Sequence, residues 1–251
     1  PRPAPARRPL RPEDAKLIRS LVLHEDAHLI VLEKPPGLAV QGGTGTHRHV
    51  DGMLDALAKD GERPKLVHRL DKETSGILVV ARTAAAARFL TAAFRAQKVR
   101  KLYWAVVVGE VRGQEGVIDL ALAKRGGVLE KMAADEEGKY ARTRWRVIQR
   151  SGKVGAWLGL MPLTGRTHQI RAHCAAMGWP ILGDGKYGGK AAHPGTAPPG
   201  LMLHARELEL PHPAGGTLGA RAEPSRTFKD GLAWLGMQPE TLPGSRLADW
   251  T

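Results

Sequence analysis

The segment that most constrains this chain is a charged turn that leads directly into an apolar run. Its sequence is HRLDKETSGILVV, in which Asp71 stands between Arg69 and Lys72, just before Thr-Ser-Gly. The apolar residues 77–80 must be buried, so the residues before them lie at the edge of a core, where a cleft can form. Asp71 can then be a carboxylate positioned for nucleophilic or acid–base chemistry. A turn carboxylate paired with Arg69 or Lys72 is the alternative that spacing alone leaves open.

A second polar segment is PLTGRTHQIRAH, residues 162–173, and it predicts a helix over 167–177. Arg166, His168 and Arg171 fall at the start of this helix. Cationic side chains and free N–H groups at a helix N-terminus favour an anion, either a phosphate or a carboxylate. A capped helix with a solvated basic face is the alternative interpretation.

Tyr103 starts an apolar strand predicted over 102–108, directly after a basic segment that ends in Lys101. Tyrosines in such positions are usually core residues whose hydroxyl group has one partner. A tyrosine ring is also a good surface on which a base taken out of its helix can stack. The residues alone leave both interpretations open.

The net charge of the chain is +13, from 38 Lys and Arg against 25 Asp and Glu. A surplus of this size points to a polyanion, and nucleic acid is the commonest such partner. An anionic membrane surface is less favoured, because the sequence has no amphipathic helix with a uniformly basic face. A basic composition without functional meaning is the other alternative, since many of these charges are Arg in an Ala-, Gly- and Pro-rich chain.

Neither a metal nor a cofactor is expected. Cys174 is the only cysteine, which excludes an intrachain disulfide and a cysteine zinc cluster and fits a reducing cytoplasm. His168 and His173 are five residues apart, a poor spacing for sharing a metal on one helix face. Residues 184–191 look like a phosphate loop but lack its opening Gly and its final Ser or Thr. No apolar run approaches the roughly 20 residues that span a bilayer, and no signal peptide is visible.

The predicted elements indicate an α+β protein with a mainly antiparallel mixed sheet and flanking helices. Residues 1–20, which begin with alternating Pro and Arg, are expected to form an arm or linker, with ordered structure from about Leu21. A catalytic domain is expected over 21–238 and a C-terminal tail over 239–251. Strands are predicted at 21–24, 28–33, 75–81, 102–108, 140–149, 154–162 and 201–210, and helices after Thr83 and over 167–177 and 226–235.

Four segments, in this order, resemble the motifs of the RluA-type RNA pseudouridine synthases. They are LIVLEKPPGLAVQGG, HRLDKETSGILVVART, KLYWAVVVGE and PLTGRTHQIRAHCAAMGWPILGDGKYG, and the likeness covers most of residues 21–235. The resemblance implies a pseudouridine synthase fold with a central active-site cleft. It also implies that the protein converts a uridine in structured RNA to its 5-ribosyl isomer, without a metal or a cofactor.

The resemblance also implies a role for each motif residue. Asp71 would be the nucleophile, attacking either C1′ of the ribose or C6 of the base. Tyr103 would stack on the uracil and remove the C5 proton, and Arg171 would form a buried ion pair with Asp71. Arg69 would fill the space left by the flipped base. The further residues expected to contact the RNA or the base are His68, Lys101, Arg166 and His168.

Within this family, GLAVQGGTGT and LMLHARELELPHP look most like the RluC branch, which modifies large-subunit ribosomal RNA. The expected partner is that RNA or a ribosome-assembly intermediate. The expected protein is a cytoplasmic monomer with no membrane and no obligate protein partner. Enzymes of this branch typically carry an S4-type domain before the catalytic domain. Because the chain begins with Pro and not Met, we expect it to be the catalytic domain of a longer protein.

Three other functions compete with this expectation. One is the same reaction by an enzyme that naturally lacks the S4-type domain, whose substrates then include transfer RNA. Another is a catalytically silent RNA-binding module, in which Asp71 is expendable. The third is a glycosidase or nucleosidase that uses Asp71 with Glu73. Such enzymes need two carboxylates on opposite sides of one sugar bond, roughly 5 to 9 Å apart. Residues two apart on an extended segment point the same way, so this function is the weakest of the three.

Overall fold

The computed structural model describes residues 10–43, 45–125, 131–134, 137–240 and 242–250. Its strands are β1 (Val22–Glu25), β2 (Leu29–Lys34), β3 (Lys65–Leu66), β4 (Ser75–Ala81), β5 (Arg100–Val108), β6 (Glu115–Asp119), β7 (Leu122–Arg125), β8 (Lys131–Ala134), β9 (Arg142–Ser151), β10 (Gly155–Pro162), β11 (Leu203–Pro211) and β12 (Thr217–Arg221). Its helices are α1 (Pro12–Ser20), α2 (Val50–Met53), α3 (Ala84–Arg95), α4 (Gln169–Ala176) and α5 (Arg226–Trp234), with 3₁₀ turns η1 (Leu54–Leu57), η2 (Gly189–Ala192) and η3 (Leu247–Asp249).

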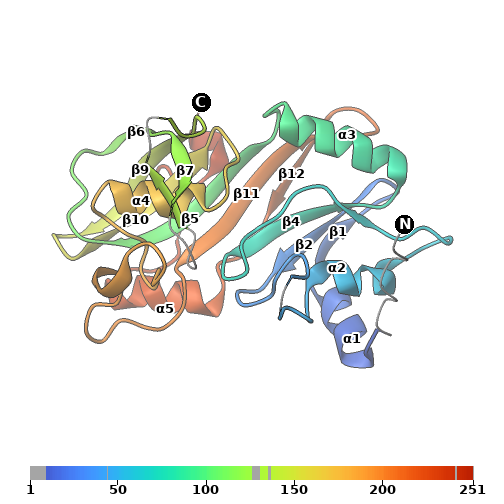
Figure 1. Cartoon of the computed structure of the whole chain (residues 1–251), viewed down its shortest axis with the longest axis horizontal. Helices are drawn as coiled ribbons and strands as arrows, with labels where there is room; N and C mark the ends of the chain where they lie inside the picture. Colours follow the sequence, from blue (N-terminus) through green and yellow to red (C-terminus); the bar gives the residue numbers. More distant parts are fainter. Residues whose placement is uncertain (1–9, 44, 126–130, 135–136, 241, 251) are drawn as a thin grey trace.

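One ten-stranded sheet runs through the molecule in the order β1-β2-β4-β11-β5-β10-β9-β6 (Figure 1). β3 pairs with β4 and β12 with β11, while β7 and β8 form a separate hairpin. β4 and β11 pair in parallel, and the other strand pairs of the described residues are antiparallel. The predicted α+β class with a mainly antiparallel mixed sheet is therefore confirmed.

Residues 29–32 of β2 and 77–81 of β4 are all apolar and buried because helices cover both faces of these strands (Figure 1). Alternate residues such as Leu32 and Val80 pack on the side of α1 and α2. Their neighbours, such as Val31 and Val79, pack under α3. Since successive side chains of a strand point to opposite faces, a continuous apolar run serves both cores. The loop that carries Asp71 enters β4 from between these two layers.

Gly76 lets β4 approach β11 closely just after the turn that carries Asp71. Its φ is +108°, and a Cβ atom there would lie 2.2 Å from the backbone oxygen of Ala205. The parallel register pairs Gly76 with Ala205 and Ser75 with His204. A side chain at position 76 is therefore excluded both by the conformation and by the contact.

Ordered structure begins before Leu21, so the expectation for this boundary is wrong. Helix α1 covers residues 12–20, and its Ile18 is fully buried against the core beside α2. Asp14, in its first turn, accepts hydrogen bonds from Arg11 and Arg48 at 3.1 and 2.7 Å. These tertiary contacts stabilise a short helix that propensity alone does not predict. Residues 1–9 of the expected arm lie outside the described residues.

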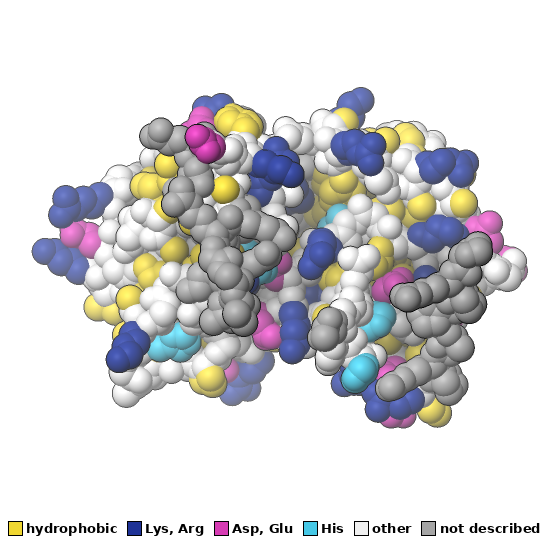
Figure 2. Space-filling model, in the orientation of Figure 1, with side chains coloured by type: hydrophobic (Ala, Val, Ile, Leu, Met, Phe, Trp, Pro, Cys, Tyr) yellow, Lys and Arg dark blue, Asp and Glu magenta, His cyan; other side chains and the backbone are white. Residues whose placement is uncertain are grey.

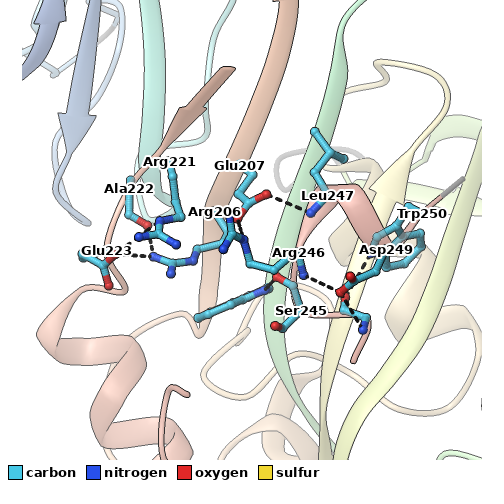
Figure 3. A network of polar contacts seen from close by, with 12 residues as sticks. Arg206, Glu207, Arg221, Ala222, Glu223, Ser245, Arg246, Leu247, Asp249 and Trp250 are labelled. Carbon is cyan, nitrogen blue, oxygen red and sulfur yellow. Dashed lines mark hydrogen bonds and ion pairs between the residues drawn. The ribbon is translucent and has the colours of Figure 1, made fainter. Parts of the chain in front are cut away.

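The C-terminal segment packs on the sheet beside β11 (Figure 3). The Glu207 carboxylate accepts hydrogen bonds from the Leu247 N–H at 2.8 Å and from the Arg246 side chain. The indole of Trp104 donates to the Ser245 carbonyl at 2.9 Å, and Trp250 is 2% exposed. The described part of the expected tail therefore contributes to the core.

Candidate active site

A cavity of about 410 Å³ brings together the candidate residues of the sequence analysis. Its walls come from the loop before β4, from the inner face of α3, from β5 and from the loop between β10 and α4. The residues from separate motifs that line it are Asp71, Tyr103, Arg171, His68, Arg69, Lys101, Arg166 and His168. Segments up to about 100 positions apart in the sequence thus form one site.

Lys34 supports the loop that carries Asp71. This fully buried side chain donates hydrogen bonds to the carbonyls of Pro35, Leu38 and Lys72 at 2.9, 2.8 and 2.9 Å. Burial lowers the pKa of Lys34 to about 8. The sequence analysis did not identify this residue, although a lysine at the end of an apolar strand is a usable signal. Its ammonium group joins the turn after β2 to the turn of Asp71.

Arg171 has two carboxylate partners, and the closer one is Asp184. Its Nε and Nη2 donate to Asp184 at 2.9 and 2.8 Å, whereas Nη1 lies 3.6 Å from Oδ2 of Asp71. The contact expected between Arg171 and Asp71 is present, but it is the longer of the two. Burial opposes the guanidinium charge, while the hydrogen bonds to Asp184 and the two carboxylate charges raise the pKa of Arg171. Asp184 therefore fixes the group that faces Asp71.

Asp184 and Tyr187 are site residues that sequence reasoning missed. The Asp184 side chain is fully buried and also accepts from the Tyr187 N–H at 3.1 Å. The Tyr187 ring lies 5.1 Å from the Arg171 guanidinium, and its hydroxyl lies 2.8 Å from Nδ1 of His168. Both residues stand in the segment set aside as an incomplete phosphate loop. The available signal was a carboxylate two residues after the apolar pair 181–182, inside the fourth motif.

The helix predicted over 167–177 begins later than expected, at Gln169. His168 adopts a left-handed conformation, with φ 52° and ψ 22°, which is uncommon for a residue with a side chain. The amide oxygen of Gln169 accepts a hydrogen bond from the Arg166 N–H at 3.0 Å and stabilises this turn. Arg166 and His168 therefore lie in the preceding loop and not in the helix.

The unusual backbone of His168 directs its ring toward the nucleophile candidate. Nε2 lies 3.5 Å from Oδ1 of Asp71. Burial lowers the pKa of His168, the charge of Asp71 opposes that shift, and Arg171 adds to it. Backbone strain of this kind is concentrated at functional sites. His168 thus contacts Asp71 directly, in addition to lining the cavity expected to receive RNA.

Tyr103 lies on β5, opposite Leu160 and Ala205, and faces the cavity. Burial raises the pKa of Tyr103 well above its usual value, and the negative charge of Asp71 raises it further. The hydroxyl group is therefore protonated in the free protein. For Tyr103 to accept a proton, its pKa must first fall, either because the site becomes less buried or because Asp71 loses its charge.

His68 lines the cavity as a neutral side chain. Its ring stacks on Phe94 at 4.3 Å, and its Nε2 accepts a hydrogen bond from the Val79 N–H at 2.8 Å. Burial lowers the pKa of His68 to about 3. It can therefore contact a base but not attract a phosphate as a cation. Lys101 and Arg69 carry positive charge at the same cavity, with the Lys101 pKa lowered by burial.

Neutral buried histidines make the fold sensitive to acid. Burial lowers the pKa of His68 to about 3 and that of His204 to about 4. Below pH ~6.5 the unfolded chain binds protons that the folded chain does not, so stability is complete above that pH and is lost on acidification. Between pH 6.5 and 5, each such histidine should lower the free energy of unfolding by about 1.4 kcal/mol for every pH unit of acidification.

Urea unfolding at a series of pH values measures this slope. His204→Gln should reduce the slope by the contribution of one histidine, at most about 1.4 kcal/mol per pH unit. A constant free energy of unfolding between pH 7 and 5 would contradict the burial of both rings.

The described residues form neither a metal-binding cluster nor a membrane-spanning helix. No group of three or more His, Cys, Asp or Glu side chains is placed to hold a metal ion. No helix in that part of the chain is both long and apolar enough to cross a membrane.

The family model and the similar proteins with known names are all RNA pseudouridine synthases. Residues 28–176 match the family model described as RNA pseudouridylate synthase. The "Ribosomal large subunit pseudouridine synthase C" of Vibrio vulnificus is 40% identical over 200 residues, which cover 78% of this chain and 63% of that protein. The chain thus spans a little under two thirds of that relative. The "Dual-specificity RNA pseudouridine synthase RluA" of Yersinia pestis is also 40% identical, over 78% of this chain and 95% of its own length.

A solved structure agrees with these sequence matches. The protein titled "Human RNA Pseudouridylate Synthase Domain Containing 4" superposes with a TM-score of 0.76 and 30% identity. The superposition covers 89% of this chain and 97% of the human one. The structural similarity therefore extends over most of this chain and nearly all of the human one.

Proposed function

The chain belongs to the RNA pseudouridylate synthase family, and we propose that it isomerises uridines of RNA to pseudouridine with Asp71 as the nucleophile. One observation carries the proposal. A single cavity is lined by the Asp71 carboxylate, by Arg171 and by the ring of Tyr103. The Arg171 guanidinium lies 3.6 Å from Asp71 and is held in place by a second carboxylate, that of Asp184. Such a pocket suits a nucleotide flipped out of its helix, which is read by stacking and by polar contacts. A module that only binds RNA does not require this arrangement.

The isomerisation needs one bond to break and another to form. In the first route, an Asp71 oxygen attacks C1′, the N1–C1′ bond breaks, and the released uracil turns to present C5. The C5–C1′ bond then forms as the ester to Asp71 breaks, and the C5 proton leaves. In the second route Asp71 adds to C6, the N1–C1′ bond breaks, the turned ring forms the C5–C1′ bond, and loss of the C5 proton releases Asp71 from C6. In both routes N1 gains a proton as C5 loses one, so atoms and oxidation state are conserved.

Arg171 and His168 position the nucleophile. The guanidinium stabilises the charged carboxylate and orients it, because Asp184 leaves Arg171 little freedom to turn. His168 contacts the other carboxylate oxygen, at 3.5 Å. The arrangement holds the attacking group in one geometry before RNA arrives.

Tyr103 is proposed to stack on the uracil and to take the C5 proton late in the reaction. The charge of Asp71 contributes to the raised pKa of Tyr103. An ester between Asp71 and the ribose carries no charge, so this contribution to the raised pKa of Tyr103 is absent while the ester exists. The Tyr103 hydroxyl then loses its proton more readily than in the free protein, which prepares Tyr103 to accept the proton from C5 in the next step.

Tyr103→Phe should separate stacking from proton transfer. The ring remains, so RNA affinity should stay near that of the unmodified protein, while turnover should fall by about 10²- to 10⁴-fold. If Asp71 adds to C6, quenched reactions should then accumulate a species in which RNA is bound covalently to Asp71. Turnover at the normal rate would leave Tyr103 with a stacking role alone.

The proposed substrate is large-subunit ribosomal RNA, acted on by a cytoplasmic monomer. Support comes from the similarity to the Vibrio protein and from the net charge of +13. A second candidate is activity on more than one class of RNA. It is favoured by the Yersinia relative, whose name states dual specificity and which matches over nearly its whole length.

Tritium release from RNA transcribed with 5-tritiated uridine tests the reaction. Formation of the C5–C1′ bond must expel the hydrogen on C5, so tritium should appear in water as pseudouridine forms. A glycosidase would instead leave tritium on free uracil. RNA binding without release from ribosomal RNA fragments or assembly intermediates would favour the silent module.

A further inference from the structure

Most arginines of the described residues have a carboxylate, a carbonyl or an aromatic ring as partner. Arg19, Arg69, Arg88 and Arg95 are exceptions, since nothing in the described part of the chain pairs with them. All four are exposed, and Arg88 and Arg95 belong to α3. Unpaired guanidinium groups that gather at one place are available for an external anion.

The two arginines of α3 share a face with Thr91. Positions 88, 91 and 95 follow the spacing i, i+3, i+7, which aligns side chains along one stripe of a helix. We call this stripe the α3 tract (Arg88, Thr91 and Arg95). It borders a shallow depression of about 360 Å³, whose other lining residues are Ala87 and Ala92. The small alanines leave the space between the arginines open.

The depression joins the active-site cavity, because Thr91 and Arg95 line both. Lys101 lines the cavity next to them, and exposed Lys98 lies in the turn between α3 and β5. Lysine and arginine side chains are visible along the upper part of the molecule in Figure 2, over the place that α3 holds in Figure 1. A ligand that enters the cavity can therefore continue over α3.

We propose that the α3 tract binds the phosphodiester backbone of the RNA strand next to the target uridine. The inference rests on the proposed function and adds to it the path of the flanking strand. A nucleotide in the cavity stays linked to its neighbours, so the strand must leave over the rim. The tract spans about 10 Å along the helix, from the rise of 1.5 Å per residue. A stacked strand carries roughly three phosphates over that length.

The side-chain types of the tract fit phosphates. Guanidinium groups bind phosphate oxygens through two hydrogen bonds, and a threonine hydroxyl can donate another. Such contacts fix the register of the strand and carry no sequence information. The α3 tract should therefore contribute affinity for structured RNA of many sequences.

The salt dependence of RNA binding tests the α3 tract without any need for turnover. The protein with Asp71→Asn is titrated with a ribosomal RNA fragment over a range of salt concentrations. Adding Arg88→Gln should weaken binding by about threefold to tenfold at low salt and reduce the slope of log K against log salt by about 1. Adding Arg95→Gln as well should reduce it by about 2 in total. Ala92→Glu, which keeps a good helix former, should weaken binding further by repulsion.

Arg19→Gln is the matched control. Arg19 is also exposed and unpaired among the described residues, but it lies on α1, away from the cavity. If Arg88→Gln gives the same slope as Arg19→Gln, the α3 tract is not an RNA contact. Normal tritium release by the unmodified protein together with that result would overturn this inference alone. A changed slope without tritium release would overturn the proposed function alone, and absence of RNA binding would overturn both.

Discussion

Replacing Asp71 by asparagine should lower uridine isomerisation by roughly 10⁴-fold or more, a scale typical for loss of a covalent nucleophile. Asparagine has the shape of aspartate but cannot form the ester with the ribose or the bond to C6. RNA affinity should stay within about twofold, because the cavity and the surrounding cations are unchanged. Melting should also change little, since Arg171 keeps its closer partner Asp184 at 2.8 and 2.9 Å.

Glu73→Gln is the control for this experiment. Glu73 stands two residues after Asp71 in the same loop, with its side chain 50% exposed and 4.0 Å from Lys72. The control should isomerise uridine at nearly the normal rate. Loss of activity on replacing Glu73 would revive a mechanism with two carboxylates, and activity retained without the Asp71 carboxylate would exclude it as the nucleophile.

The strands and helices that the sequence predicts well are those with local signals. β4 has the predicted bounds, because its apolar run is continuous and starts after a Thr-Ser-Gly turn. Thr83 caps α3 as expected, its hydroxyl accepting from the Ala86 N–H at 3.1 Å. α1 and the short edge strand β12 were missed. Their stability depends on contacts with distant segments, and β12 has the weak pattern TLGAR.

In the candidate site, too, the sequence predicted the features that depend on local motifs but not those that depend on contacts between distant segments. The second, third and fourth motifs supplied most of the residues that line the cavity. The fourth motif contains Asp184 but did not indicate its role, which depends on the path of the loop after α4. Nor could the motifs supply the left-handed backbone of His168, because such a conformation is imposed by the surrounding contacts.

Arg171→Met should cost both stability and activity, and the stability loss comes from Asp184. That carboxylate is fully buried, and its removal from water is compensated by two hydrogen bonds from Arg171. Breaking a buried pair by removing one partner typically costs about 3–5 kcal/mol. Urea unfolding of the variant measures the loss. An unchanged free energy of unfolding would show that the pair does not stabilise the fold.

A second substitution separates the two roles of Arg171. In the double variant Arg171→Met with Asp184→Asn, no buried charge lacks a partner, and the asparagine oxygen can still accept from the Tyr187 N–H. The double variant should therefore be more stable than Arg171→Met alone, with a coupling energy of about 1–3 kcal/mol. Isomerisation should stay lost, because no guanidinium faces Asp71 at 3.6 Å. Recovery of activity together with stability would mean that Arg171 acts only through the fold, and that Asp71 needs no cation to react.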